Sequence, residues 1–221
     1  EQMRATVRRF LARHASSAAM EEWREAGLIP RSFWRAAAEA GLLGLSVDPD
    51  HGGLGADFRY EALLAYEIYL HGLNAFALPL HNAMVAPYLI DYATAEQKRR
   101  WLPGLVSGDL LTAIAMTEPG AGSDLQAIAT TAIRQGDHYI LNGQKTFISS
   151  GQTANLIVVV CKTDPGARAG GISLLVVETD RVEGFRRGRN LDKLGLEAAD
   201  TSELFFDNVA VPAANLLGER E

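Results

Sequence analysis

The spacing of hydrophobic residues changes about halfway along the chain. Up to Gly108, apolar residues recur at three- and four-residue intervals, as in Val7, Phe10 and Leu11, and this spacing predicts amphipathic helices. After Leu110 the apolar residues form short runs rich in β-branched side chains, which predicts strands. The clearest of these runs cover 111–116, 155–161 and 172–177. We therefore expect an all-α front part and a mainly β back part.

Local signals place several helix ends in the front part. Pro30 is a favoured first-turn residue, and the helix that it begins ends near Gly41, a natural left-handed cap. Asp57 is suited to capping a further helix. Thr94 and Gln97 have the spacing of a capping box, in which each side chain bonds the free amide of the other.

The pair Asn142-Gly143 predicts a tight turn in the back part. It follows the apolar segment 139–141, and both of its residues tolerate positive φ. A two-residue β-hairpin turn is therefore the best local interpretation.

Length and composition indicate two folded domains. The chain has 221 residues, more than the ~100–150 typical of one domain, and its 48% hydrophobic and 22% charged content is that of a folded globular protein. The helical and strand patterns do not alternate, which disfavours a doubly wound sheet and favours segregated domains. The expected class is α+β, with a helical domain over 1–110 and a β domain over 111–221.

Charge and sequence content exclude several functions. A formal net charge of -6 gives no general basic field for nucleic acid, and no apolar stretch approaches the ~20 residues that span a bilayer. The first residues lack the apolar centre of a secretory signal, and the one cysteine, Cys161, stands in an apolar run as a small buried hydrophobe. We expect a protein of the bacterial cytoplasm or the mitochondrial matrix.

The segment 116–124, MTEPGAGSD, is the strongest candidate for a ligand loop. It follows a predicted strand, and its glycines let backbone amides approach an anion such as a pyrophosphate. The alternative is a plain turn between strands. A Rossmann motif is excluded because the third glycine and the following helix are missing. The five histidines show no metal-ligand spacing, no GxSxG elbow occurs, and the arginines between Arg181 and Lys193 are expected to form a solvated charged face.

Five blocks of the sequence resemble the acyl-CoA dehydrogenase family of flavoproteins. AIAMTEPGAGSDLQAI resembles the family's first flavin-binding signature, and YILNGQKTFISSG resembles its next hairpin and the strand beside the flavin ring. KLGLEAADTSELFFDNVAVPAANLLGE is similar to the end of its middle domain. GLLGLSVDPDHGGLG and LHNAMVAPYLIDYATAEQKRRWLPGLVSGD are similar to its N-terminal helical domain. The sequence looks closest to the long-chain-type branch.

This resemblance implies which residues bind FAD. The first contact strand and its following residues face the flavin, and the hydroxyl of Thr117 lies toward the pyrimidine side of the ring. Ser123 matches a position that contacts both FAD and the acyl-CoA substrate. The second contact strand has Phe-Ile-Ser where the family commonly has Trp-Ile-Thr. The implied cofactor-binding residues are Ile114, Ala115, Met116, Thr117, Ser123, Phe147, Ile148 and Ser149.

The resemblance also implies a fold and an activity. The family has an N-terminal helical domain, a middle β-barrel-like domain and a C-terminal helical bundle, and it assembles as a homotetramer; the bundle is absent from this chain. In the family, a glutamate of the bundle removes the α-proton of the acyl thioester while the flavin accepts the β-hydride, and an electron-transfer flavoprotein reoxidises the FAD. That glutamate is expected beyond residue 221. Two alternatives stay open: a flavin oxidase or monooxygenase of the same fold that uses O2, and a non-catalytic member that binds acyl-CoA or a protein.

Overall fold

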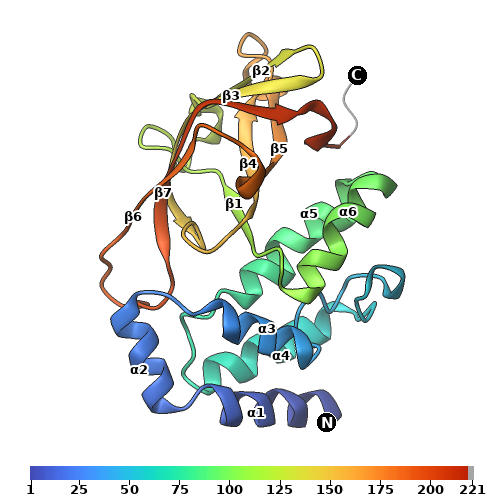
Figure 1. Ribbon diagram of the computed structural model, residues 1–221, viewed down its shortest axis with the longest axis vertical. Coiled ribbons are helices and arrows are strands. Elements are labelled where there is room, and N and C mark those ends of the chain that lie inside the picture. The colour runs from blue at the N-terminus through green and yellow to red at the C-terminus, as the bar shows by residue number, and fades with distance from the viewer. Residues whose placement is uncertain (219–221) are drawn as a thin grey trace. The chain divides into compact units, whose positions relative to one another are not determined.

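The chain forms two compact units in a computed structural model that describes residues 1–218. The first unit contains Glu1–Leu111 and Asp192–Asp200, and the second contains Thr112–Leu191 and the chain from Thr201 onward. Figure 1 draws the helices of the first unit in blue to green. The expected α+β class, helices first and strands second, is confirmed. The units differ from a single division at residue 110 because Asp192–Asp200 belongs with the helices.

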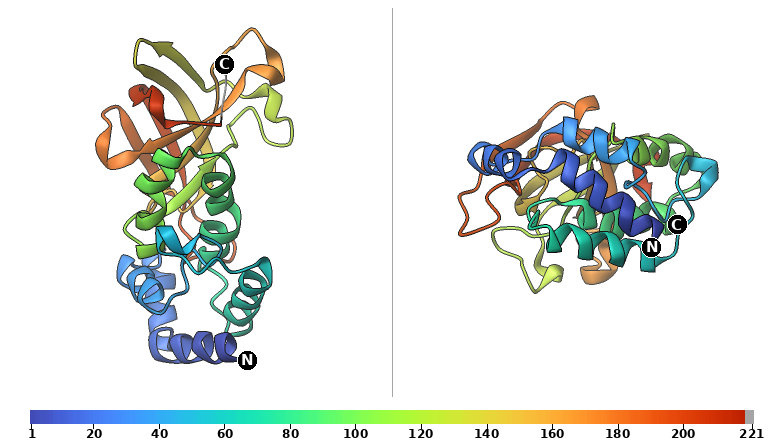
Figure 2. Two further views of the ribbon diagram at one scale, coloured as in Figure 1. Left: turned by 90° about the vertical axis from the view of Figure 1, so that its right-hand side faces the viewer. Right: turned by 90° about the horizontal axis from the view of Figure 1, so that it is seen from below.

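The helical unit is built around an aromatic centre. The ring of Phe33 lies 5.1 Å from that of Phe10, 4.7 Å from Trp23 and 4.9 Å from Phe76, between ring centroids. These residues are buried, as the helical spacing predicted for Phe10. Figure 2 shows the helices from two further sides. They are α1 Gln2–His14, α2 Ser17–Ala26, α3 Arg31–Glu39, α4 Phe58–Leu70, the π-helix Leu80–Val85, α5 Ala86–Tyr92 and α6 Ala95–Ser107.

The predicted capping box and the Asp57 cap are confirmed, whereas Pro30 lies just before its helix and not in the first turn. The Thr94 amide donates to Gln97 Oε1 over 2.8 Å, and the Gln97 amide donates to Thr94 Oγ1 over 3.2 Å, so the capping box closes. Asp57 caps α4 by accepting the amide of Arg59 at 2.9 Å, and Pro30 precedes α3. No helix among residues 1–218 is both long and apolar enough to cross a membrane.

The second unit is one mixed sheet of eight strands. Its order is β6-β7-β3-β2-β4-β5-β8, and β1 pairs with β4. Strand β4 is buried at six successive positions, including Cys161, and it runs parallel to β1 and antiparallel to β5. The strands are β1 Thr112–Ala115, β2 Thr131–Gln135, β3 His138–Ser149, β4 Leu156–Lys162, β5 Ile172–Glu178, β6 Phe185–Asn190, β7 Thr201–Pro212 and β8 Leu216–Leu217.

The predicted turn at Asn142-Gly143 is wrong, because both residues lie inside β3. The turn between β2 and β3 is at 136–137, and Gly136 has a φ of 63°. At Gly143 the pairing of β3 with β7 shifts in a β-bulge, and a Cβ there would lie 2.4 Å from Thr130 Oγ1. Glycine is therefore needed for a close approach in the sheet and not for a turn.

Candidate flavin site

Strand β1 ends where two candidate flavin-contact residues begin. Ile114 pairs with Val158 of β4, and the neighbouring Ala115 is fully buried against the sheet. Met116 and Thr117 follow the strand and are half-buried, so they lie at the boundary between the core and the surface. The predicted flavin-contact segment thus leaves the sheet directly after Ala115, the last paired residue of β1.

Strand β3 reaches the end of β1 through an irregularity. The amide of Thr146 donates to the carbonyl oxygen of Thr117 over 2.9 Å. The pairing of β3 with β7 shifts between Lys145 and Ile148, so Thr146 and Phe147 form a bulge. The structure therefore brings Thr117, from the first predicted contact strand, beside the start of the second.

Phe147 has an unusual backbone in this bulge. Its φ is 57°, in the left-handed region that bulky side chains rarely adopt, and the residue is 68% exposed. Such a conformation costs of order 1–3 kcal/mol, and residues of this kind cluster at ligand sites. An exposed aromatic ring on a strained backbone marks this position as a site candidate.

The other predicted contact residues lie in three different environments. Ile148 is 3% exposed and pairs with Ser202 of β7, so it belongs to the core. Ser149 is half-buried and pairs with Thr201. Ser123 is exposed on the loop beyond the tight turn that the Glu118 amide and the Ala121 carbonyl close at 2.9 Å.

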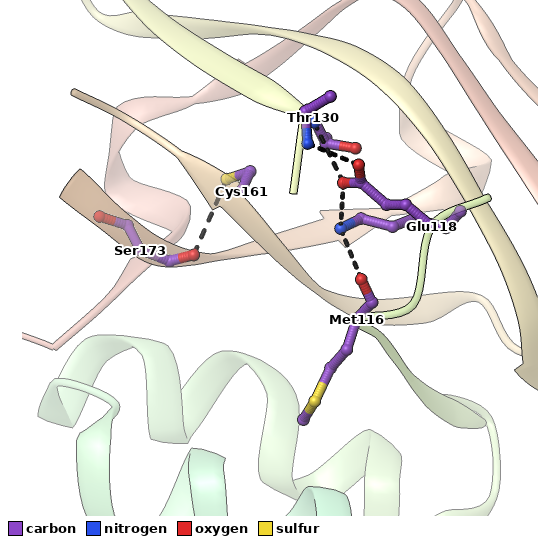
Figure 3. A network of polar contacts seen from close by, with 7 residues as sticks. Met116, Glu118, Thr130, Cys161 and Ser173 are labelled. Carbon is purple, nitrogen blue, oxygen red and sulfur yellow. Dashed lines mark hydrogen bonds and ion pairs between the residues drawn. The ribbon is translucent and has the colours of Figure 1, made fainter. Parts of the chain in front are cut away.

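A buried ion pair holds the loop that follows β1 (Figure 3). Lys145 Nζ donates to Glu118 Oε1 over 2.8 Å and to the Met116 carbonyl oxygen over 2.9 Å. Glu118 also accepts the amide of Ala129 at 2.6 Å and that of Thr130 at 3.0 Å. The Lys145 side chain is fully buried and that of Glu118 is 6% exposed. The loop, the approach to β2 and the middle of β3 are thus tied together.

These contacts fix the charge of Glu118. Burial alone would raise its pKa, but the Lys145 ammonium and the amide donors outweigh burial and hold the pKa of Glu118 below its ordinary value. Asp124 accepts the amide of Gln126 at 3.1 Å. Both carboxylates therefore accept backbone amides of the same loop region.

Lys145 was not among the predicted site residues, although one signal in the sequence pointed to it. Lysine is rarely buried, so its residue type predicts an exposed position. Side chains of a strand alternate between faces, and Lys145 has the same parity as the buried Tyr139 and Leu141. That alternation would have placed it on the inward face of β3.

The prediction that the arginines between Arg181 and Lys193 form a solvated face is wrong for Arg187. Arg187 Nε donates to the carbonyl of Gly151 at 3.0 Å, and Nη2 donates to that of Ala154 at 2.6 Å and to Thr179 Oγ1 at 3.0 Å. Arg187 thereby fastens the segment after β3, whereas Arg186 is exposed. No group of three or more His, Cys, Asp or Glu among residues 1–218 could hold a metal ion.

Two family models account for most of the chain. The one described as acyl-CoA dehydrogenase, N-terminal domain, matches residues 1–109, and the one described as acyl-CoA dehydrogenase, middle domain, matches residues 113–209. The chain belongs to the acyl-CoA dehydrogenase family. Members of this family are oxidoreductases. The two matched regions follow the change from helices to strands.

Individual acyl-CoA dehydrogenases agree with this assignment. The chain is 44% identical to the mitochondrial long-chain specific acyl-CoA dehydrogenase of Rattus norvegicus, over 90% of this chain and 46% of that protein. An acyl-CoA dehydrogenase from Geobacillus kaustophilus is 53% identical with a TM-score of 0.95, over 99% of this chain and 58% of that one. A glutaryl-CoA dehydrogenase from Mycobacterium smegmatis, solved in complex with FADH2, is 32% identical with a TM-score of 0.87, over 100% of this chain and 55% of that one. The chain thus spans about half the length of these relatives.

Proposed function

We propose that this chain supplies the N-terminal and middle parts of an FAD-dependent acyl-CoA dehydrogenase, which converts an acyl-CoA thioester to the trans-2-enoyl-CoA. The observation that carries the proposal is the meeting of β1 and β3, where Thr117 accepts the Thr146 amide beside the strained and exposed Phe147. These are the positions at which the family resemblance expects the flavin. The substrate belongs to fatty-acid oxidation or a related acyl catabolism.

The residues at this meeting point fit a flavin. The exposed ring of Phe147 offers an apolar wall, and the hydroxyls of Thr117 and Ser149 are half-buried donors. At Gly120 and Gly122 a Cβ would meet nothing within 4 Å, so the loop leaves room for a ligand at its backbone. When bound, FAD supplies the hydride acceptor. Thr117 and Ser149 would hydrogen-bond its polar edge, and Phe147 would keep water from its ring.

The remaining roles belong to the complete protein. The proton-abstracting glutamate is expected outside residues 1–221, and we expect Ser123 to contact the CoA thioester. We expect an electron-transfer flavoprotein to accept the electrons and the complete protein to be a homotetramer. Its compartment is the bacterial cytoplasm or the mitochondrial matrix, since the relatives include bacterial and mitochondrial enzymes.

Anaerobic reduction tests this function. The complete protein should purify with FAD, and acyl-CoAs should bleach its oxidised-flavin absorbance. Reoxidation by an electron-transfer flavoprotein that is much faster than reoxidation in air identifies a dehydrogenase. Fast reoxidation in air instead would favour the oxidase alternative, and a flavin that no acyl-CoA reduces would contradict the proposal.

Replacing Ser149 by valine should weaken FAD binding. The change removes a hydroxyl donor at a half-buried position, and leaving its partner unpaired costs about 1–3 kcal/mol. The measurement is the FAD dissociation constant of the complete protein by fluorescence titration. Ser149→Thr is the matched control, because threonine has the shape of valine and keeps the hydroxyl. Equal affinity in the valine and threonine variants would remove Ser149 from the flavin site.

Replacing Ser123 by leucine should act on the substrate. Because Ser123 is exposed on a loop, the change should leave the unfolding temperature nearly unchanged. A bulky side chain beside the thioester should raise KM by roughly tenfold, about 1.4 kcal/mol of binding. Steady-state kinetics of the Ser123→Leu and Ser123→Ala variants check this. Wild-type KM in the leucine variant would show that the acyl-CoA does not pass Ser123.

A further inference from the structure

Hydrogen bonds from β3 orient the backbone that follows β1. The Met116 carbonyl accepts the Lys145 ammonium at 2.9 Å, and the Thr117 carbonyl accepts the Thr146 amide at 2.9 Å. Both carbonyl groups therefore point toward β3. In a trans peptide the N–H points opposite to the C=O, so the amide of Thr117 points away from β3. The Lys145 contact thus decides where this amide can donate.

Stability alone does not account for the ion pair. Withdrawing an ammonium and a carboxylate from water costs several kcal/mol per ion, and a pair of apolar side chains of similar volume is often as stable. Four hydrogen bonds offset this cost. One joins Lys145 to Glu118, one joins Lys145 to the Met116 carbonyl, and two join Glu118 to backbone amides, so both side chains are fixed in one position. Such a pair is suited to specifying geometry.

The pair also keeps the local charge balanced. Glu118 and Lys145 are in direct contact at 2.8 Å and are almost completely buried, so little solvent screens either charge. Glu118 follows Met116 and Thr117 directly in the chain. An unbalanced charge on Glu118 or Lys145 would therefore act close to a flavin ring bound beside Met116 and Thr117. Removing one partner should therefore change the field in one direction, and removing the other should reverse it.

We infer that Lys145 is a positioning residue of the flavin site: through the Met116 carbonyl it fixes the orientation of the peptide between Met116 and Thr117, which borders the flavin, and with Glu118 it holds the charge beside the flavin near zero. This inference rests on the proposed function. Lys145 itself does not contact FAD and acts only through the loop that follows β1. Its loss should therefore change both the affinity for FAD and the flavin midpoint potential.

Three variants of the complete protein separate the two effects. Lys145→Met leaves the Glu118 carboxylate without its cation, so at a pH that keeps Glu118 ionised the midpoint potential should be more negative than that of wild type at the same pH. Glu118→Gln leaves the Lys145 ammonium unbalanced, and burial already lowers the pKa of Lys145, so at a pH that keeps Lys145 protonated the potential should be more positive than that of wild type. The double variant should return the potential close to the wild-type value. Both variants without Lys145 should bind FAD at least about tenfold more weakly, because the Met116 carbonyl has lost its donor.

Asn215→Ala is the matched control for a buried polar lesion elsewhere in the same unit. Asn215 is 1% exposed and donates to the Val176 carbonyl of β5 at 2.9 Å. Opposite shifts of potential in the two single variants, not seen in the control, support the inference. If Lys145→Met does not fold, the sign of the shift in Glu118→Gln and the affinity of the double variant decide the same question.

Two further results contradict the inference and differ in their consequence. Potentials and FAD affinities that match those of Asn215→Ala, in a protein that acyl-CoA still reduces, would overturn the role of Lys145 and leave the proposed function intact. A wild-type protein that binds no FAD would overturn the proposed function and this inference together.

Discussion

The 221-residue chain, mixed with FAD and acyl-CoA, is expected to leave the oxidised-flavin absorbance unchanged. Removing the α-proton of a thioester needs a carboxylate within ~2.6–3.2 Å, in a dry site that brings its pKa near neutrality. The family resemblance places that carboxylate in the C-terminal bundle. The expected effect is a complete loss of flavin reduction.

The carboxylates of the candidate loop are not expected to act as that base. Glu118 is bonded to Lys145 and to two backbone amides, and these contacts hold its pKa below the ordinary value. Proton abstraction would require breaking a buried ion pair. Asp124 caps the short helix that follows it. Neither side chain has the environment of a general base.

The test compares the chain with the complete protein under anaerobic conditions. Acyl-CoAs of several lengths are added to each, and the absorbance of oxidised flavin is followed. The helix α4 exposes Phe58, Tyr66 and Leu70 at 71%, 58% and 62%, so the chain is expected to aggregate and should be studied dilute. Substrate-dependent bleaching by the 221-residue chain would show that a base lies within it.

Glu61 should make the helical unit less stable as the pH rises. It is 5% exposed; its Oε2 accepts Asn82 Nδ2 at 3.1 Å, and Oε1 has no hydrogen-bond partner within residues 1–218. Burial raises the pKa of Glu61 from 4.5 to about 7, against a smaller opposing effect of the Asn82 bond. A folded-state pKa above the unfolded value gives stability that is present below pH 4.5 and lost as the pH rises through 7.

Glu61→Gln should remove this dependence. Glutamine carries no titrating proton and can still accept the Asn82 amide. Between pH 4.5 and pH 8, its free energy of unfolding relative to wild type should rise by roughly 3 kcal/mol, from 1.36 kcal/mol per pKa unit. All three tryptophans, Trp23, Trp34 and Trp101, lie in the helical unit, so their fluorescence during urea unfolding reports on this unit alone.

Glu67, on the same helix, is the control with the opposite sign. The bond from Arg8, with the nearby charge of Arg4, holds the pKa of Glu67 below its ordinary value. The stability from Glu67 is therefore present above its unfolded-state pKa and lost as the pH falls through its folded-state pKa.

Parallel pH profiles of the free energy of unfolding for wild type and Glu61→Gln would show that the buried Glu61 carboxyl is not destabilising.

Local chemistry made part of this fold predictable. The Thr94 and Gln97 capping box and the Asp57 cap involve bonds over two or three residues, so spacing alone identified them. The π-helix Leu80–Val85 was not predicted. Asn82 within it bonds the Gly44 amide and the Leu42 carbonyl, which are distant in the chain. Contacts of this range leave no local pattern.

The candidate site shows the same limit. Thr117 and Phe147 were predicted as flavin contacts from the family resemblance, and hydrophobic periodicity alone predicted neither. The Asn142-Gly143 pair predicted a turn because its local preference is strong, but both residues lie inside β3, where Thr130 closely approaches Gly143. Lys145 was missed because its residue type indicates a surface, although strand alternation indicates the inward face of β3, and its pairing with Glu118 balances the buried charge.

The interleaving of the two units along the chain sets the order in which they can fold. Ala198 belongs to the core of the helical unit, although it is synthesised after most of the sheet. Domains usually fold as units from the N-terminus during synthesis. Here the core of the helical unit lacks Ala198 until Asp192–Asp200 has been synthesised. The helical unit is begun first, and its core is completed only after β1 to β6 have been made.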